Sequence, residues 1–468
     1  MPLFSVLVAV VVMLLLVLLL RLDAFLALLI SAFVVGALNH MDALAVLQSV
    51  LKGVGATMGS VALILVFGAM LGKLAGDSGA ASVIAEWLVA RSGRGGVQLS
   101  LALAGLLVGL PMLYNAGFLV LMPIVGGLAA ATGMPMVYLG LPLASALSVT
   151  HGFLPPHPAP TFMAFLYHAN VNRTLALGLV AAVPACLIGG IGLTRALARL
   201  GVAQQSHGAL ASAMVGIPST ETARRPGMAT SVLTMLVPIF LMLVAALSDA
   251  LTGTTGIDPF RPDFDFHAAL VHVVPDAGVR TVVVALKFVG NANVALFVAV
   301  LVALHTFGRR MGRSMAVLME DLRAGVGAIA PILLVIAAGG AFSQVMRDAG
   351  VGEFVAQRAA GLQVNPLLLA FGVAALMRLA VGSATVAGMT TAGLLAPLVV
   401  TTRASPELMV LATGAGSLMF SHFNDTGFWM FKEYFGLTIP ETLATWSVME
   451  MTVALVGMGA VLAMQAAS

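Results

Sequence analysis

The sequence predicts an all-α integral membrane protein made of two inverted repeats, each with about five membrane helices, a re-entrant hairpin and broken helices at the membrane midplane. The first reason is composition, because 60% of the 468 residues are hydrophobic and only 9% are charged, against about 25% charged in an average soluble domain. The second is a series of apolar runs of membrane-spanning length, and the third is a match between the two halves of the chain. No stretch is left over for a soluble domain.

Apolar runs long enough to cross a hydrocarbon core, roughly 17–25 residues, recur along the whole chain. The first run has no Lys or Arg before it, and no small-residue cleavage site follows it before the next apolar stretch. It is therefore predicted to be a membrane helix and not a signal peptide. The clearest runs cover residues 4–20, 59–76, 173–198, 229–250, 288–306, 325–345 and 443–465.

An offset of 271 residues, the difference between His422 and His151 (422 − 151), relates the two halves without gaps. With this offset, SVTHGFLPPHP in the first half falls on MFSHFNDTGFW in the second, and GAMLGKLAGDSG falls on GGAFSQVMRDAG. Chance alignment of Gly-rich apolar stretches is the alternative, and the coincidence of His and Asp, which are rare here, argues against it. Internal repeats of this kind are typical of transporters.

Basic residues indicate how the halves are oriented. The positive-inside rule places clusters of arginine in the cytoplasm, and such a cluster lies where the halves meet: Arg195, Arg199, Arg224 and Arg225. We therefore expect a first repeat over 1–200, a cytoplasmic linker over 201–228 and a second repeat over 229–468, with the Asp-bearing loop 251–287 outside. An odd number of crossings in each half inverts one repeat relative to the other and leaves both termini outside.

Helix-breaking residues interrupt the apolar pattern at four places, two in each half. The expected hairpins, 97–132 and 365–401, are interrupted by GLPMLYNAGF and AVGSATVAGM. The expected helices over 135–150 and 407–421 end at the polar segments HGFLPPHPAP and SHFNDTGFW. Gly and Pro free backbone groups that lipid cannot satisfy, so the breaks are predicted to face protein or a water-filled cavity and to form a midplane binding site.

The polar residues at these breaks are the predicted substrate-binding residues. Their hydroxyl, amide and imidazole groups offer hydrogen bonds, and the helix N-termini after the breaks offer N–H groups to an anion. Asp425, His422 and His151 are also predicted to couple transport to protons, because ionisable residues inside a membrane are functional candidates. A half-helix cap is the alternative for Asp425, and packing or capping is the alternative for His422. The full set is Tyr114, Asn115, His151, Gly382, Ser383, Thr385, His422, Asn424, Asp425 and Thr426.

Three further residues near the breaks are not included in the predicted binding set. Arg378 lies four residues before Gly382, and three roles are open for it: pairing with a substrate carboxylate, pairing with a carboxylate of the protein, or snorkelling to the interface. Trp429 and Trp446 are expected to be interfacial anchors.

Several function classes are excluded. No GxxxxGK[ST] signature occurs, so transport must be driven by a gradient. Gly76-Asp77-Ser78-Gly79 resembles a serine-nucleophile turn over four residues only, and no HExxH occurs, so the protein is predicted not to be an enzyme. The 22 Lys+Arg against 19 Asp+Glu give no support for a nucleic-acid partner, and neither a cofactor nor a metal is expected.

Several blocks of sequence resemble the gluconate permease family of proton symporters. They are GSATVAGMTTAGLL, GAGSLMFSHFNDTGFWMFKEYFGLT and ETLATWSVMEMTVALVGM, together with HGFLPPHPAP and GAMLGKLAGDSG, and the likeness extends from residue 20 to 460. The resemblance implies a secondary transporter of the bacterial inner membrane that imports gluconate or a related small hydroxy acid anion with a proton. One departure matters: the family's aromatic-Asp-Val-Gly-Phe motif reads Tyr114-Asn115-Ala116-Gly117-Phe118 here. If that Asp helps to bind a proton, its absence here moves proton coupling to Asp425 or the histidines.

One alternative stays open, a sodium-coupled carrier or exchanger of the same fold for another organic acid such as D-serine or glycerate. Hydroxyl and carbonyl oxygens at Ser383, Thr385 and Asn424 could equally coordinate Na⁺. The expected partners are a small organic acid anion, protons and the lipid bilayer, with a homo-oligomer left open.

Overall fold

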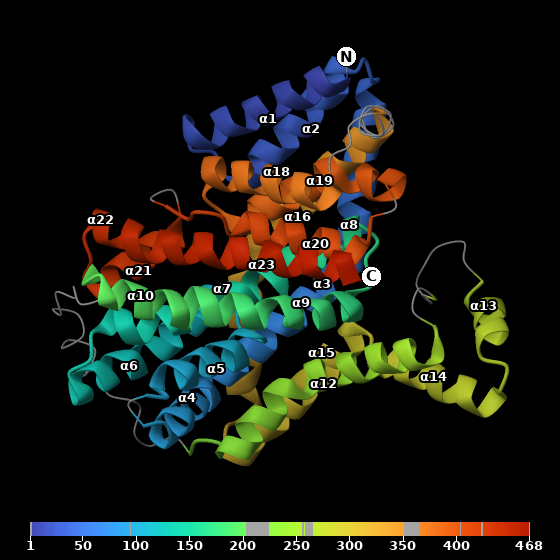
Figure 1. Cartoon of the computed structure of the whole chain (residues 1–468). Coiled ribbons are helices and arrows are strands. Elements are labelled where there is room, and N and C mark those ends of the chain that lie inside the picture. Colours follow the sequence, from blue (N-terminus) through green and yellow to red (C-terminus); the bar gives the residue numbers. More distant parts are fainter. Residues whose placement is uncertain are drawn as a thin grey trace.

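All regular structure in the described part of the chain is helical (Figure 1). The computed structural model describes residues 2–93, 95–202, 224–254, 257, 265–350, 365–402, 404–422 and 425–467. Within these ranges eight helices are long and apolar enough to cross a membrane: Ala43–Asp77, Tyr114–Thr132, Met136–Leu166, Val171–Arg199, Met228–Thr252, Ala292–Met311, Met315–Asp348 and Ile439–Ala467. The predicted class, an all-α integral membrane protein, is confirmed.

Side-chain caps explain where several helices of the first half begin. Asp23 and Asp42 accept the N–H groups of Phe25 and Leu44, and so satisfy donors that a helix start leaves free. The elements are α1 (Pro2–Leu18), α2 (Ala24–Leu38), α3 (Ala43–Asp77), α4 (Ala80–Arg91), α5 (Val97–Gly109), α6 (Tyr114–Thr132), α7 (Met136–Phe153), α8 (Pro158–Leu166), α9 (Val171–Cys186), the π-helix η1 (Leu187–Gly192) and α10 (Leu193–Arg199).

The second half contains the same kinds of element. They are α12 (Met228–Thr252), α13 (Phe266–Val273), α14 (Ala277–Val289), α15 (Ala292–Ala303), η3 (Leu304–Gly308), η4 (Arg309–Met311), α16 (Met315–Asp348), α18 (Pro366–Val381), α19 (Ala384–Thr402), α20 (Pro406–Ser417), α21 (Thr426–Phe435), α22 (Ile439–Thr442), η5 (Leu443–Ser447) and α23 (Val448–Ala467). Most of the expected linker, residues 203–223, lies outside the described residues, and the three-part division of the chain stays a prediction.

The longest helices of the two halves, α3 and α16, end at positions that the offset of 271 residues relates to each other. The last residue of α3 is Asp77 and the last of α16 is Asp348 (348 − 77 = 271). The two helices pack against each other, and their backbones meet at glycines: a Cβ on Gly340 would lie 2.0 Å from Thr57 Oγ1 and 2.8 Å from the carbonyl oxygen of Gly53. Small residues allow this close approach. The inversion of the repeats stays a prediction.

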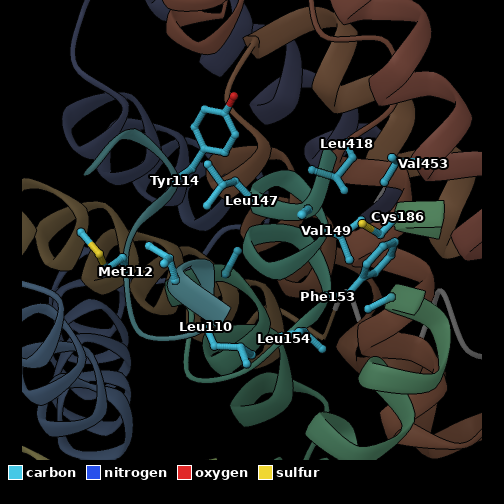
Figure 2. Packing of buried hydrophobic residues seen from close by; sticks show 14 of the residues in the cluster. Leu110, Met112, Tyr114, Leu147, Val149, Phe153, Leu154, Cys186, Leu418 and Val453 are labelled. Carbon is cyan, nitrogen blue, oxygen red and sulfur yellow. The ribbon is translucent and has the colours of Figure 1, made fainter. Parts of the chain in front are cut away.

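Helix α7 lies at the centre of the main apolar core. In Figure 1 it runs alongside α9 and α23, and both helices contact it. Figure 2 shows Phe153 of α7 next to Cys186 of α9 and Val453 of α23, and all three belong to one buried cluster. A helix apolar on every side is typical of a core position, so the polar groups that α7 does carry are enclosed by protein.

Candidate functional site

Helix breaks occur at the four places where the sequence predicts them. In each break one helix ends and the next begins a few residues later: at Gly109 and Tyr114, at Phe153 and Pro158, at Val381 and Ala384, and at Ser417 and Thr426. One predicted end is wrong: α20 stops at Ser417, not at residue 421. The reason is local, since Phe420 has a φ of 46°, in the left-handed region that a continuous helix of L-residues cannot contain.

The side chains of Arg378 and Asp425 form the charged centre of the site. Arg378 lies in the last turn of α18 and is 3% exposed. Its Nη2 contacts Oδ2 of Asp425, and the Ser421 hydroxyl donates to the same oxygen. Oδ1 accepts the N–H of Gly427 at 3.0 Å, so Asp425 also caps α21. Of the roles left open for Arg378, the structure has it paired with a carboxylate of the protein.

Arg378 retains unused hydrogen-bond donors. Its Nε and Nη1 are buried and have no partner among the residues that the structure describes. Burying a guanidinium whose N–H donors lack hydrogen-bond acceptors costs free energy. A second carboxylate placed beside Asp425 would satisfy these nitrogens, and arginine binds carboxylates in just this way, with two donors at once.

Glu450 is a second buried carboxyl at the same place, and it is not among the residues predicted from the sequence. It lies at the beginning of α23 and is 1% exposed. Its Oε1 accepts the hydroxyl of Ser148 on α7 at 2.5 Å, whereas its Oε2 has no partner within the described ranges. Arg378 and Asp425 both interact with it electrostatically. The signal was present, because Glu450 is the only charged residue of the apolar run 443–465.

Aromatic side chains enclose this cluster. The ring of Tyr114 lies 5.7 Å from that of Trp446 and 5.9 Å from that of Phe118, and its hydroxyl points away from Leu147 (Figure 2). Trp446 is 2% exposed, and its Nε1 donates to Ser421 Oγ at 2.8 Å. The expectation that Trp446 is an interfacial anchor is therefore wrong, because packing and this hydrogen bond hold it beside Asp425. Trp429 is 40% exposed.

Two histidines connect the break between α5 and α6 to the break between α18 and α19. Nε2 of His151 lies 3.3 Å from the hydroxyl of Thr385, and the rings of His151 and His157 are 5.6 Å apart. His157 donates from Nε2 to the carbonyl oxygen of Gly109 at 2.6 Å. His151 also interacts electrostatically with Asp425. His151 and Thr385, both predicted site residues, thus lie within reach of the charged centre.

The other predicted residues lie in different surroundings. Gly382 and Ser383 form the break between α18 and α19: Gly382 has a φ of 79°, and Ser383 Oγ accepts the N–H of Val386 at 3.3 Å. His422 donates to the carbonyl oxygen of Leu379 at 3.1 Å. Asn115 and Thr426 are exposed, and Asn424 lies outside the described residues.

A small cavity of about 20 Å³ lies beside the first break. It is lined by the break residues 110–113, by His157 and by Leu65, Gly68 and Ala69 of α3, among others. The backbone of this break therefore borders a small space that α3 helps to line.

Spanning helices, interrupted helices and an ion pair at the breaks are features of a membrane transporter. The chain belongs to the GntP permease family, whose sequence model, described as GntP family permease, matches residues 1–467. It is a permease and not an enzyme, and it is a multi-pass protein of the bacterial inner membrane.

Three characterised relatives are similar over their whole length. The Gnt-II system L-idonate transporter of Escherichia coli K12 is 41% identical over 466 residues, 100% of this chain and 99% of the relative. A high-affinity gluconate transporter of the same organism is 40% identical over 98% of both chains. The gluconate permease of Bacillus subtilis 168 is 38% identical over 99% of both.

Two solved structures share the fold. The YdaH transporter of Alcanivorax borkumensis, described as having an unusual topology, superposes with a TM-score of 0.60 at 20% identity, covering 95% of this chain and 97% of that one. MtrF of Neisseria gonorrhoeae, from a class of antimetabolite efflux pumps, gives a TM-score of 0.59 at 14% identity, covering 90% and 84%. At these identities the likeness concerns the fold alone.

Proposed function

We propose that the protein imports gluconate or a closely related sugar-acid anion together with protons. The observation that carries the proposal is Arg378, a buried guanidinium at a helix break with two nitrogens unpartnered among the described residues. The relatives named for gluconate and L-idonate, 38–41% identical over nearly the whole chain, support the substrate class.

The substrate's carboxylate binds Arg378 in this proposal, beside the carboxylate of Asp425. Its hydroxyl groups then meet the polar side chains of the adjoining breaks, His151 and Thr385, whose contact at 3.3 Å joins the two halves of the chain. Hydroxyls and imidazole nitrogens both donate and accept hydrogen bonds, which suits a polyhydroxy acid better than an apolar acid.

An anion that enters a cell works against the inside-negative membrane potential unless a cation enters with it. Protons suit this site, because ionisable side chains gather in the charged centre. Asp425, His422 and His151, which the sequence nominates for proton coupling, stay predictions. Coupling to Na⁺ remains the alternative, and uptake at fixed pH with and without Na⁺ separates the two.

The direct test is uptake of labelled gluconate into proteoliposomes under an imposed inward proton gradient, comparing the natural chain with Arg378→Lys. Lysine keeps the charge but loses the planar fork, so we expect KM for gluconate to rise about tenfold, the equivalent of one charge-assisted hydrogen bond of about 1.5 kcal/mol. Arg173→Lys is the matched control, because the Arg173 side chain is 49% exposed and lies on α9. Unchanged gluconate uptake by Arg378→Lys would remove Arg378 from the binding site.

A further inference from the structure

We propose that Glu450 is the residue that carries the coupled proton, with Asp425 serving as the fixed counter-ion of Arg378. This inference rests on the proton symport proposed above and names the group responsible for it. It departs from the sequence-based nomination of Asp425, and the reason lies in how differently the two carboxyls are surrounded.

Glu450 lies deep in a spanning helix and has few hydrogen bonds. It follows Ile439 by eleven residues (450 − 439) and precedes Ala467 by seventeen (467 − 450) in the span Ile439–Ala467. Only 1% of its surface is exposed, Ser148 is its one hydrogen-bond partner in the part of the chain described, and its Oε2 makes no hydrogen bond there. An ionised carboxylate that is buried with one neutral donor is costly, and a protonated one is much less so.

Asp425 has the opposite environment. A guanidinium, a serine hydroxyl and a backbone N–H all donate to its two oxygens, from Arg378, Ser421 and Gly427. Three donors, one of them charged, stabilise the ionised form of a carboxyl. Asp425 can therefore serve as the counter-ion that holds Arg378 in place, whereas Glu450, with one neutral donor in the described part of the chain, has the freedom to gain and lose a proton.

The charged groups that interact with Glu450 come from several elements. Arg378 attracts its ionised form and Asp425 repels it, and the phenol of Tyr114 on α6 lies close enough to interact with it. His151, on the same helix as Ser148, interacts with Asp425 and Arg378. The titratable residues of α9 and α20, which also pack against α23, are Arg173, Cys186 and Glu407; Arg173 and Glu407 face each other at 3.9 Å.

The balance of charge links the proton to the substrate. With Glu450 ionised, an entering anion meets two carboxylates and one guanidinium, so a proton on Glu450 removes one of the two repulsions. Anion binding and protonation of Glu450 must then favour each other by the same free energy. One proton taken up from the outer solution and released inside, with one anion, moves no net charge.

The experiment measures gluconate uptake by the natural chain, Glu450→Gln and Glu450→Asp in proteoliposomes. The membrane potential is held constant while the pH gradient is varied. The natural chain should accumulate labelled gluconate about tenfold for each unit of inward pH gradient, the limit for one proton per anion, and lose this with a protonophore. Glu450→Gln should lose that accumulation entirely, yet exchange gluconate between equal concentrations at a rate that no longer depends on pH. Glu407→Gln is the matched control, because Glu407 is also buried, 6% exposed, and pairs with Arg173 instead.

The outcomes separate the two proposals. If the natural chain shows no accumulation driven by the proton gradient, the proposed symport fails, and the assignment of Glu450 fails with it. If the natural chain accumulates gluconate and Glu450→Gln accumulates it equally, only the assignment of Glu450 is overturned. Should Glu450→Gln not reach the membrane, Glu450→Asp decides: a displaced pH profile of uptake supports the assignment, and an unchanged profile overturns it.

Discussion

Arg378 and Asp425, 47 residues apart in the chain, form a partly buried ion pair that joins the end of α18 to the beginning of α21. This ion pair links the two helix breaks of the second half. The pair has a structural and a functional consequence, and the two can be measured separately.

The structural consequence is the cost of breaking the pair. Removing one partner leaves an uncompensated buried charge, so we expect Arg378→Met or Asp425→Asn alone to lower the free energy of unfolding by about 3–5 kcal/mol. The double variant should lose less than the sum of the two, because neither charge is then left alone. Thermal unfolding in detergent measures all three, and additive losses would contradict a direct pairing.

The hydroxyl of Ser148 should tune the pH dependence of uptake. It is the donor to Oε1 of Glu450 at 2.5 Å, and a donor favours the ionised form of a carboxyl. Ser148→Ala should therefore keep Glu450 protonated to higher pH and shift the pH profile of gluconate uptake upward. Ser145→Ala is the control on the same helix, because Ser145 donates to the carbonyl oxygen of Pro142. A downward shift, or equal shifts in both variants, would contradict the prediction.

The contact of Thr385 with His151 should matter for substrate affinity. In the proposed site both side chains hydrogen-bond the hydroxyls of the sugar acid, so Thr385→Val should raise KM for gluconate about fivefold, the equivalent of one hydrogen bond of about 1 kcal/mol. Thr402→Val, at the other end of α19, should leave KM unchanged, since Thr402 donates to the carbonyl oxygen of Leu398. Uptake kinetics in cells check both, and equal KM values would place Thr385 outside the binding site.

The crossing of α3 and α16 should not tolerate a methyl group at Gly340. A Cβ there would lie 2.0 Å from Thr57 Oγ1, and overpacking of this kind costs about 1–3 kcal/mol. Gly340→Ala should lower the melting temperature in detergent, whereas Gly327→Ala on the same helix should not, because a Cβ at Gly327 meets nothing within 4 Å. Equal melting temperatures would mean that the helices move apart at no cost.

The helices and their breaks could be predicted from sequence because their causes are local. Proline and glycine at 109–118, 151–160 and 380–389 end helices through their own backbone chemistry, whatever packs around them. Helix α20 ends four residues before the predicted residue 421, because Phe420 adopts positive φ without being a glycine. The residue pattern does not predict that a phenylalanine adopts the left-handed backbone conformation.

The candidate site was predictable only in part. Asp425, His151 and Thr385 lie at or next to the charged centre. Asn115 and Thr426 share the same breaks but are exposed. Position in a break indicates that a residue is near the site, and it does not indicate which way the side chain points, since neighbouring residues of a helix differ by 100° in direction.

The sequence by itself determined the membrane class, the places where helices break and the family, because apolar composition, glycine, proline and long specific motifs act without reference to distant residues. Only the tertiary structure decided which charges meet. Arg378 with Asp425, and Glu450 with Ser148, are pairs 47 and 302 residues apart. In a membrane protein the lipid-facing and core-facing sides of a helix are both apolar, so the hydrophobic pattern does not report which side turns inward. Helix packing alone brings these groups together.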